Sequence, residues 1–255
     1  MALADHFSPL EFGMARHGGC KTIIHGLHAT LDLHPDWIVL QVDIQNAFNT
    51  ISWEALFCEL RAAIGSLDQL FLFVGSFYAC HLSLYFSHCS HEDEVSFLSS
   101  ESGTRQGDTL GGALFALAHL RALRTMASKY PLCLFSSLAD DTHIFGPFEA
   151  IVPAFHTLEG HLSAVGLIVQ PTKCVAWSPF GLPSSLSLPP GFSLPSTGLR
   201  ILGAPIGSDS FQASFVGDAL EVDVSIIHQL SLLGNPQVAF GLFSRCYVQR
   251  LGYLL

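Results

Sequence analysis

Few residues of this sequence carry a positive charge. Only 11 of 255 residues are Lys or Arg, against 21 Asp and Glu, and the formal net charge at pH 7 is -10. Proteins that grip a phosphate backbone usually carry a basic stripe or patch. The composition by itself therefore argues against tight binding to nucleic acid.

Paired cysteine spacings and an N-terminal targeting signal are also absent. The seven Cys are odd in number and scattered, and no basic segment leading into an apolar run opens the chain. Disulfide scaffolds and zinc fingers show short repeated spacings, and a secretory signal needs such an opening segment. We expect an intracellular protein without a signal peptide, nuclear or cytoplasmic, whose thiols are reduced and mostly packed.

The chain also lacks a long uninterrupted apolar run. The best candidate, residues 70–86, contains Ser76, His81 and Ser83 and is not closely flanked by a Lys or Arg cluster. A membrane-spanning helix needs about 20 predominantly apolar residues and usually has such flanks. We therefore predict a buried helix at this run, and no membrane partner.

The sequence does contain enough apolar material for a folded core. Apolar residues make up 49% of the chain and charged residues 13%, a balance that excludes a disordered chain. Residues 178–198 are dense in Pro, Gly and Ser and are predicted to form an exposed loop outside the core. Apolar spacing predicts helices at 20–33, 51–64, 110–130, 148–165 and after 207, and strands at 37–42, 132–137, 142–145, 167–169, 174–177 and 199–206.

Three aspartates lie at the ends of predicted strands. Asp43 follows the strand at 37–42, while Asp140 and Asp141 lie between two strands that suggest a hairpin. Adjacent carboxylates at a hairpin tip repel each other unless cations neutralise them. Oxygen ligands suit Mg²⁺ or Mn²⁺, and two such ions ~3.5 to 4 Å apart can clamp the oxygens of a phosphoryl transfer. The pattern predicts a divalent metal site, with a solvated turn as the alternative for the aspartate pair alone.

Five runs follow one another along the chain. They are QVDIQNAFNTISW (41–53), ESGTRQGDTLGGALFAL (101–117), LADD (138–141), GLIVQPTKC (166–174) and GLRILGAPIG (198–207), and a segment with Phe12, Gly13, Gly18 and Gly19 precedes them. In order and approximate spacing they resemble the palm of the reverse transcriptases carried by retrotransposons without long terminal repeats. The first segment is similar to the one that precedes the first motif of that family, and the last run is similar to the one leading into the primer grip. The resemblance covers roughly residues 10–207, and its motifs are specific in combination.

This resemblance implies an α+β fold, a reverse-transcriptase palm with a ferredoxin-like antiparallel sheet, helices on one face, and partial fingers and thumb. We expect residues 1–36 to be a remnant of the fingers and connecting helix, 37–207 to be the palm with the loop 178–198, and 208–255 to begin a thumb or connection. Relatives have longer fingers before Phe12 and a longer thumb after Gly207, so a chain truncated at both ends is expected.

The same resemblance implies an RNA-directed DNA polymerase that uses two Mg²⁺ or Mn²⁺ ions. The enzyme would transfer a nucleotide from a dNTP to a primer 3'-hydroxyl on an RNA or DNA template. Asp43, Asp140 and Asp141 would be the metal ligands, the first two being primary. The carbonyl of Ile44 would complete one metal shell. Lys173 would lie near the leaving pyrophosphate, where an ammonium can donate a proton or offset charge.

Further positions of the family motifs imply contacts with the substrate. Phe48 would pack beneath the incoming sugar and favour deoxynucleotides, although ordinary core packing explains an aromatic residue equally well. Arg105, Gln106 and Gly107 would contact the nucleotide or the template. Without the family, the same Gly-rich turn simply caps a helix, and Lys173 is a solvated side chain.

Two other functions remain open at this point. The chain could be a catalytically inactive retroelement-derived fragment that acts as an interaction module. It could also bind zinc through Cys80, His81, His88, Cys89 and His91, which lie close together in the sequence. Their spacings miss the common finger patterns, and adjacent residues rarely reach one metal.

Overall fold

The computed structural model describes residues 2–14, 16–63, 68–78, 82–87, 95–105 and 107–248. The helices are α1 (Ala2–Phe7), α2 (Gly19–Leu33), α3 (Ala47–Thr50), α4 (Trp53–Ala62), α5 (Asp68–Tyr78), α6 (Gly111–Lys129), α7 (Phe148–Ala164), α8 (Asp209–Ser231) and α9 (Pro236–Leu242), with short helical turns at Pro171–Lys173 and Phe243–Tyr247. The strands are β1 (Ile38–Val42), β2 (Leu82–Ser87), β3 (Val95–Ser100), β4 (Leu134–Leu138), β5 (Asp141–Gly146), β6 (Val175–Trp177), β7 (Gly198–Ile201) and β8 (Ala204–Gly207).

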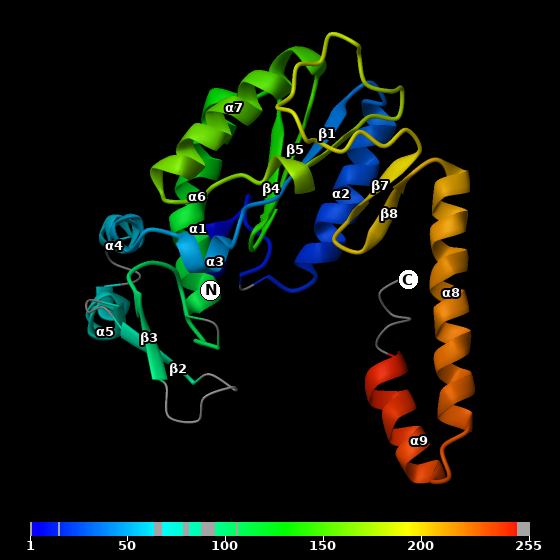
Figure 1. Cartoon of the computed structure of the whole chain (residues 1–255). Coiled ribbons are helices and arrows are strands. Elements are labelled where there is room, and N and C mark those ends of the chain that lie inside the picture. The colour runs from blue at the N-terminus through cyan, green and yellow to red at the C-terminus, as the bar shows by residue number, and fades with distance from the viewer. Residues whose placement is uncertain are drawn as a thin grey trace.

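A four-stranded antiparallel sheet in the order β4-β5-β1-β6 forms the centre of the molecule (Figure 1). Its register sets Leu40 of β1 beside Ile144 of β5 on one side and Ala176 of β6 on the other. β1 consists almost entirely of apolar residues, as expected for a strand covered on both faces. Figure 1 shows α4, α5 and the β2–β3 hairpin to the left of this sheet, and α8 with α9 to its right.

One face of the sheet is covered by α6 and α7. Leu40 and Ile144 belong to a buried core that includes Phe115 of α6 and Phe155 of α7. Alternate residues of a strand point to opposite faces of the sheet, so the sequence neighbours of Leu40 and Ile144 point to the other face. The predicted α+β class, an antiparallel sheet with helices packed against it, is confirmed.

The other face of the sheet carries a second, smaller core. Val39 and Phe145 are paired in the register and pack with Trp177 of β6, Leu27 of α2 and Ile201 of β7. In Figure 1, α2 and the β7–β8 hairpin lie on the side of the sheet opposite to α6 and α7. The sheet is therefore covered on both faces.

The apolar run at 70–86 does not form the single buried helix that was predicted. α5 ends at Tyr78, and β2 begins at Leu82 and pairs with β3. The side chains of Leu72, Tyr85 and Phe97 are 72–78% exposed. Pairing with β3, which lies outside this run, overrides the helical spacing, and the pattern within the run cannot reveal it. Within the described ranges no helix is long and apolar enough to cross a membrane.

Two predicted strands also differ from the structure. Residues 167–169 form no strand but only an isolated bridge between Val169 and Ile44. The single strand predicted at 199–206 is the β7–β8 hairpin. Its turn holds Leu202 at φ +48° and Gly203 at φ +89°. Positive φ at both central residues is the geometry of a tight hairpin turn, so the chain reverses there.

The loop at 178–198 is mostly exposed, as predicted, but it is not outside the core. The ring of Phe192 lies 5.2 Å from that of Phe155 in an edge contact. Burial of such apolar side chains outweighs the turn-forming composition of the loop. The side chains of this loop that pack against the main core are Leu182, Leu186, Leu188 and Phe192.

Candidate functional site

The sheet register brings the predicted aspartates to one edge. Asp43 follows Val42, whose partner in β5 is Thr142, and Asp141 is the first residue of β5. Asp140 lies in the turn between β4 and β5. Because β1 and β5 are adjacent and antiparallel, the end of one strand meets the start of the other. Three carboxylates far apart in the sequence therefore share one end of the sheet.

The charges of these carboxylates act on one another. Burial raises the pKa of Asp43, the nearby Lys173 lowers it, and the negative charge of Asp140 raises it. Burial likewise raises the pKa of Asp141, and the charges of Asp140 and Asp43 raise it further. A like charge within a few ångströms disfavours ionisation. The site thus holds excess negative charge that a bound cation would relieve.

The donor set suits a hard divalent cation in its chemistry. Carboxylates supply only oxygen ligands, which Mg²⁺ and Mn²⁺ prefer. Among the residues that the structure describes, however, no three His, Cys, Asp or Glu side chains gather closely enough to hold a metal ion as they stand. The carboxylates of Asp43, Asp140 and Asp141 would have to rotate to converge on one ion.

Lys173 and Cys174 flank the first of these aspartates. The Nζ atom of Lys173 lies 4.0 Å from Oδ1 of Asp43, and both side chains are substantially exposed. Such a pair is weak, so the ammonium remains free to reorient toward another anion. The Sγ atom of Cys174 accepts a hydrogen bond from the Asp43 N–H at 3.4 Å. Cys174 thus holds the backbone of Asp43, while the side chain of Asp43 stays partly exposed.

The predicted role of Ile44 depends on its backbone carbonyl. Its side chain is buried, and the residue forms an antiparallel bridge with Val169. The flanking residues make the hydrogen bonds of this bridge, such as the Gln170 N–H to the Asp43 carbonyl at 2.9 Å. A bridge of this kind does not use the carbonyl of its central residue. The Ile44 carbonyl is therefore not committed to the bridge.

Phe48 joins the first predicted motif to the second. Its half-buried ring stacks on Phe115 of α6 with centroids 4.5 Å apart. Its carbonyl accepts a hydrogen bond from the Thr104 N–H at 2.5 Å, and the Gly103 N–H donates to the Ile51 carbonyl at 2.8 Å. Phe48 therefore does pack against the core, as the alternative prediction held, and the residue lies beside the Gly-rich turn.

The Arg105 side chain is engaged by α5. Its guanidinium donates to the carbonyl of Phe77 and lies 5.0 Å from the centre of the Tyr78 ring. The Tyr78 hydroxyl donates to Oδ2 of Asp108 at 2.5 Å. These contacts fix the turn that carries Arg105 and its neighbours against α5.

The rest of this predicted cluster is only partly described. Gly107 has φ +87°, and, its chain neighbours aside, no atom of the described residues lies within 4 Å of where a Cβ would be. Its backbone is therefore open to an approaching ligand. Gln106 lies outside the described residues, and so does the whole predicted zinc set of Cys80, His81, His88, Cys89 and His91. These roles stay predictions.

Sequence reasoning did not single out four buried polar residues behind the Asp140 turn. Glu11, His119, Ser137 and Thr142 are each almost fully buried. No motif marks them, and Glu11 reaches the turn only because residues 10–12 pair with β4. The sequence signal that could have found them is a polar residue within a segment whose pattern predicts burial.

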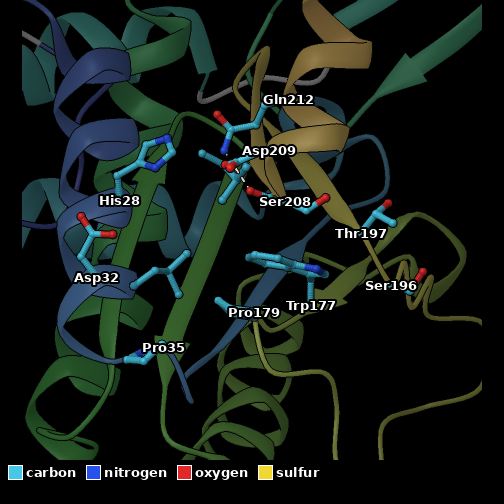
Figure 2. Close-up of a pocket in the computed structure, with 13 residues that line it drawn as sticks. His28, Asp32, Pro35, Trp177, Pro179, Ser196, Thr197, Ser208, Asp209 and Gln212 are labelled. Atoms are coloured by element: carbon cyan, nitrogen blue, oxygen red, sulfur yellow. Dashed lines mark hydrogen bonds between the residues drawn. The ribbon is translucent and has the colours of Figure 1, made fainter.

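A separate cavity of about 480 Å³ lies between α2, β6 and the start of α8 (Figure 2). The Gln212 amide donates to the Gly207 carbonyl at 2.9 Å beside it. None of the predicted catalytic residues lines this cavity. Its lining includes His28, Asp32, Trp177, Ser208, Asp209 and Gln212.

Gly103→Ala is expected to destabilise the fold by about 2 to 4 kcal/mol. Gly103 has φ +79°, and a Cβ there would lie 2.5 Å from the backbone of Asn49. A left-handed L-residue costs about 1 to 2 kcal/mol, and overpacking adds a similar amount. Urea unfolding would measure the loss. The matched control is Gly160→Ala, on the exposed side of α7 with open space at its Cβ, which should stabilise by up to about 1 kcal/mol.

Equal stability of the Gly103→Ala variant and the wild type would contradict the close approach between the first and second motifs.

Comparison with known proteins identifies the family. Residues 2–206 match the family model described as reverse transcriptase (RNA-dependent DNA polymerase). No match is found among curated proteins. Because the family match covers most of the chain, the resemblance predicted from the motifs is confirmed at the level of the family.

Solved structures share the fold at low sequence identity. An apo telomerase from Candida tropicalis, truncated from its C-terminal domain, is 12% identical with a TM-score of 0.57. A telomerase from Candida albicans, in complex with a TWJ fragment of telomeric RNA, is 11% identical with a TM-score of 0.52. Both alignments cover 82% of this chain, but only 42% and 36% of the respective telomerase chains. The chain thus spans less than half the length of these relatives.

Proposed function

Because the chain belongs to the reverse transcriptase family, we propose that it is an RNA-directed DNA polymerase that adds a nucleotide from a dNTP to a primer 3'-hydroxyl. The observation that carries the proposal is the shared sheet edge of Asp43, Asp140 and Asp141. Their mutual repulsion, which contributes to the raised pKa values of Asp43 and Asp141, is typical of a site that binds cations.

Asp43, Asp140 and Asp141 would hold Mg²⁺ or Mn²⁺, with the Ile44 carbonyl as a further oxygen ligand. When bound, two such ions would offset the charge that develops on the attacking and leaving oxygens. The protein contributes position: β1 supplies one carboxylate and the β4–β5 turn supplies the others. Catalysis would therefore depend on geometry and charge more than on a strong base.

Other residues of the chain would orient the substrate. Lys173, whose ammonium lies beside Asp43 without a strong ion pair, would donate a proton or a charge-assisted hydrogen bond to the leaving pyrophosphate. Phe48, held by its stack on Phe115, would form a rigid floor beneath the sugar. The open backbone at Gly107 would lie close to the nucleotide or the template.

The motifs support a polymerase of the type carried by retrotransposons without long terminal repeats. The fold likeness to telomerases does not discriminate between types, because identities of 11% and 12% reflect the fold alone. The partner would be an RNA or DNA template-primer. With a net charge of -10 and only 11 Lys and Arg, we expect binding to be weak and to weaken further as salt rises.

Primer extension tests the proposal directly. The wild-type chain, with poly(rA)/oligo(dT), dTTP and Mn²⁺ at low salt, should extend the primer, and Asp43→Asn should not. Asp36→Asn is the matched control, because Asp36 is an exposed aspartate just before β1 and should leave extension unchanged.

Extension by the Asp43→Asn variant would contradict the assignment of the site. No extension from well-folded wild-type protein would instead favour the non-catalytic interaction module.

A further inference from the structure

The turn that carries Asp140 adopts a conformation that its own sequence does not favour. Ala139 has φ +58°, in the left-handed region that residues with a Cβ rarely occupy. A turn of this kind persists only where its surroundings over-determine it. The neighbouring contacts should therefore explain why Ala139 stays there.

Glu11 holds the amide side of this peptide. Its Oε1 accepts hydrogen bonds from the Gly13 N–H at 2.6 Å and from the Ala139 N–H at 3.3 Å. A Cβ at Gly13 would lie 2.8 Å from the same oxygen, so only glycine lets the chain curl around the carboxyl group. The side chain is 1% exposed, which removes competition from water for these bonds.

Ser137 holds the carbonyl side. Its hydroxyl donates to the Ala139 carbonyl at 2.8 Å. Both peptide groups of Ala139 thus have a buried side-chain partner. Two backbone hydrogen bonds also fix β4 to the segment that contains Glu11. The Phe12 N–H donates to the Ser137 carbonyl at 2.8 Å, and the Ser137 N–H donates to the Leu10 carbonyl at 2.9 Å.

His119 of α6 braces this arrangement from the helix. Its Nδ1 lies 3.4 Å from the Ser137 hydroxyl, and its Nε2 lies 3.4 Å from the Thr142 hydroxyl. The Ser137 hydroxyl has one proton, which it donates to the Ala139 carbonyl. The imidazole ring thus lies between the two hydroxyls. The Thr142 hydroxyl also donates to the Asp140 carbonyl at 3.4 Å.

We propose that Glu11, Ser137, His119 and Thr142 are positioning residues that hold the Asp140–Asp141 turn in the conformation its metal-binding role requires. The metal-binding role of the turn rests on the proposed function, whereas the hydrogen bonds that hold the turn do not. None of the four side chains is exposed enough to contact a substrate directly. They act through the backbone on either side of Asp140.

Hydrogen exchange measures the hold on the turn without any catalysis. In the wild type, the amides of residues 134–142 should exchange slowly. Glu11→Ala removes the acceptor and should speed exchange at Ala139 about tenfold, the equivalent of one lost hydrogen bond. Glu11→Gln keeps an acceptor oxygen and should restore most of the protection. Equal effects of both variants, or none, would overturn the role of Glu11.

Mn²⁺ binding, followed by electron paramagnetic resonance of the free ion, tests the link to the metal site. If Glu11→Ala does not fold, Ser137→Ala and Thr142→Val take its place, because they are smaller changes that should keep the fold. Each should weaken Mn²⁺ binding about tenfold, since the ligand geometry loosens. Thr157→Val is the matched control, because its hydroxyl bonds Pro153 and Tyr130 at α7, away from the turn.

The results separate this inference from the proposed function. Wild-type protein that binds no Mn²⁺ would contradict the proposed function, while the exchange data would still decide whether Glu11 holds the turn. Normal Mn²⁺ binding by all of the network variants would overturn the positioning role even if the polymerase proposal stands.

Discussion

Asp140→Asn is expected to abolish primer extension while leaving the metal-free protein at least as stable as the wild type. The charge of Asp140 raises the pKa of both Asp43 and Asp141. Replacing this carboxylate with an amide removes that repulsion from the folded state. In the presence of EDTA, thermal unfolding should therefore begin at the same or a higher temperature than in the wild type.

Activity should respond in the opposite direction. The stabilisation of charge by a bound cation is worth several kcal/mol in the transition state, which corresponds to at least about a 10³-fold loss of rate. Mn²⁺ should raise the melting temperature of the wild type, because a ligand of the folded state stabilises it, but should not raise that of Asp140→Asn. Asp36→Asn again serves as the control. A variant that unfolds earlier than the wild type in EDTA would show that Asp140 has a structural role instead.

Local sequence patterns sufficed to predict the part of the site that is built from strand ends. The apolar run before Asp43 forms β1, and the acidic pair Asp140 and Asp141 lies at a hairpin, as predicted. Strand pairing then follows from antiparallel geometry. Such signals are contained within a few residues, so no knowledge of the tertiary structure was needed.

The features that were missed depend on contacts that the local sequence pattern does not show. Glu11 and Ala139 are 128 residues apart, and nothing near Glu11 indicates that it lies behind the turn. Tyr85 forms a strand because Phe97 pairs with it, whereas its own neighbours suggested a helix. The contacts of Arg105 with Phe77 and Tyr78 likewise depend on a helix whose position only the folded chain defines, while its contact with the substrate stays a prediction. At Tyr85, strand pairing overrides local propensity.

Two buried histidines should make the fold sensitive to acid. Burial lowers the pKa of His119 and of His143 from 6.5 to about 4. Above pH 6.5 both the folded and unfolded states are neutral at these residues. As the pH falls from 6.5 to 4, the unfolded chain binds protons that the folded chain does not, so stability falls. Each histidine accounts for about 3 kcal/mol across that window, against a typical total of about 5 to 15 kcal/mol.

The acidic residues at the site act in the opposite sense. The pKa values of Glu11, Asp43 and Asp141 are raised. Their protonation therefore favours the folded state as the pH falls, and offsets part of the loss. A comparison of the wild type with a histidine variant cancels this contribution, because the carboxylates are the same in both proteins. The difference in unfolding free energy between the two is then the quantity to measure.

His143→Leu isolates one of the two histidines. The backbone of Ser136 lies close enough to raise the pKa of His143 against the effect of burial, but among the described residues neither ring nitrogen reaches a hydrogen-bond partner. A buried polar group without a partner costs about 1 to 3 kcal/mol. The apolar variant should therefore be as stable as the wild type, or more so, at pH 7. Its advantage should grow by about 3 kcal/mol by pH 4.

Urea unfolding between pH 7 and pH 4 would measure this growing difference. Phe145→Leu is the matched control, because Phe145 lies two residues along the same strand on the same face of the sheet and does not titrate. Its difference from the wild type should stay constant with pH. If the curves of His143→Leu and the wild type ran parallel, the imidazole would have to be accommodated as a cation inside the fold. Its ring stacks on that of Phe145 with centroids 6.1 Å apart, and Phe145 packs with Leu27 of α2 in the second core. That result would therefore require the second core to open, and a faster exchange of the β5 amides at low pH would reveal it.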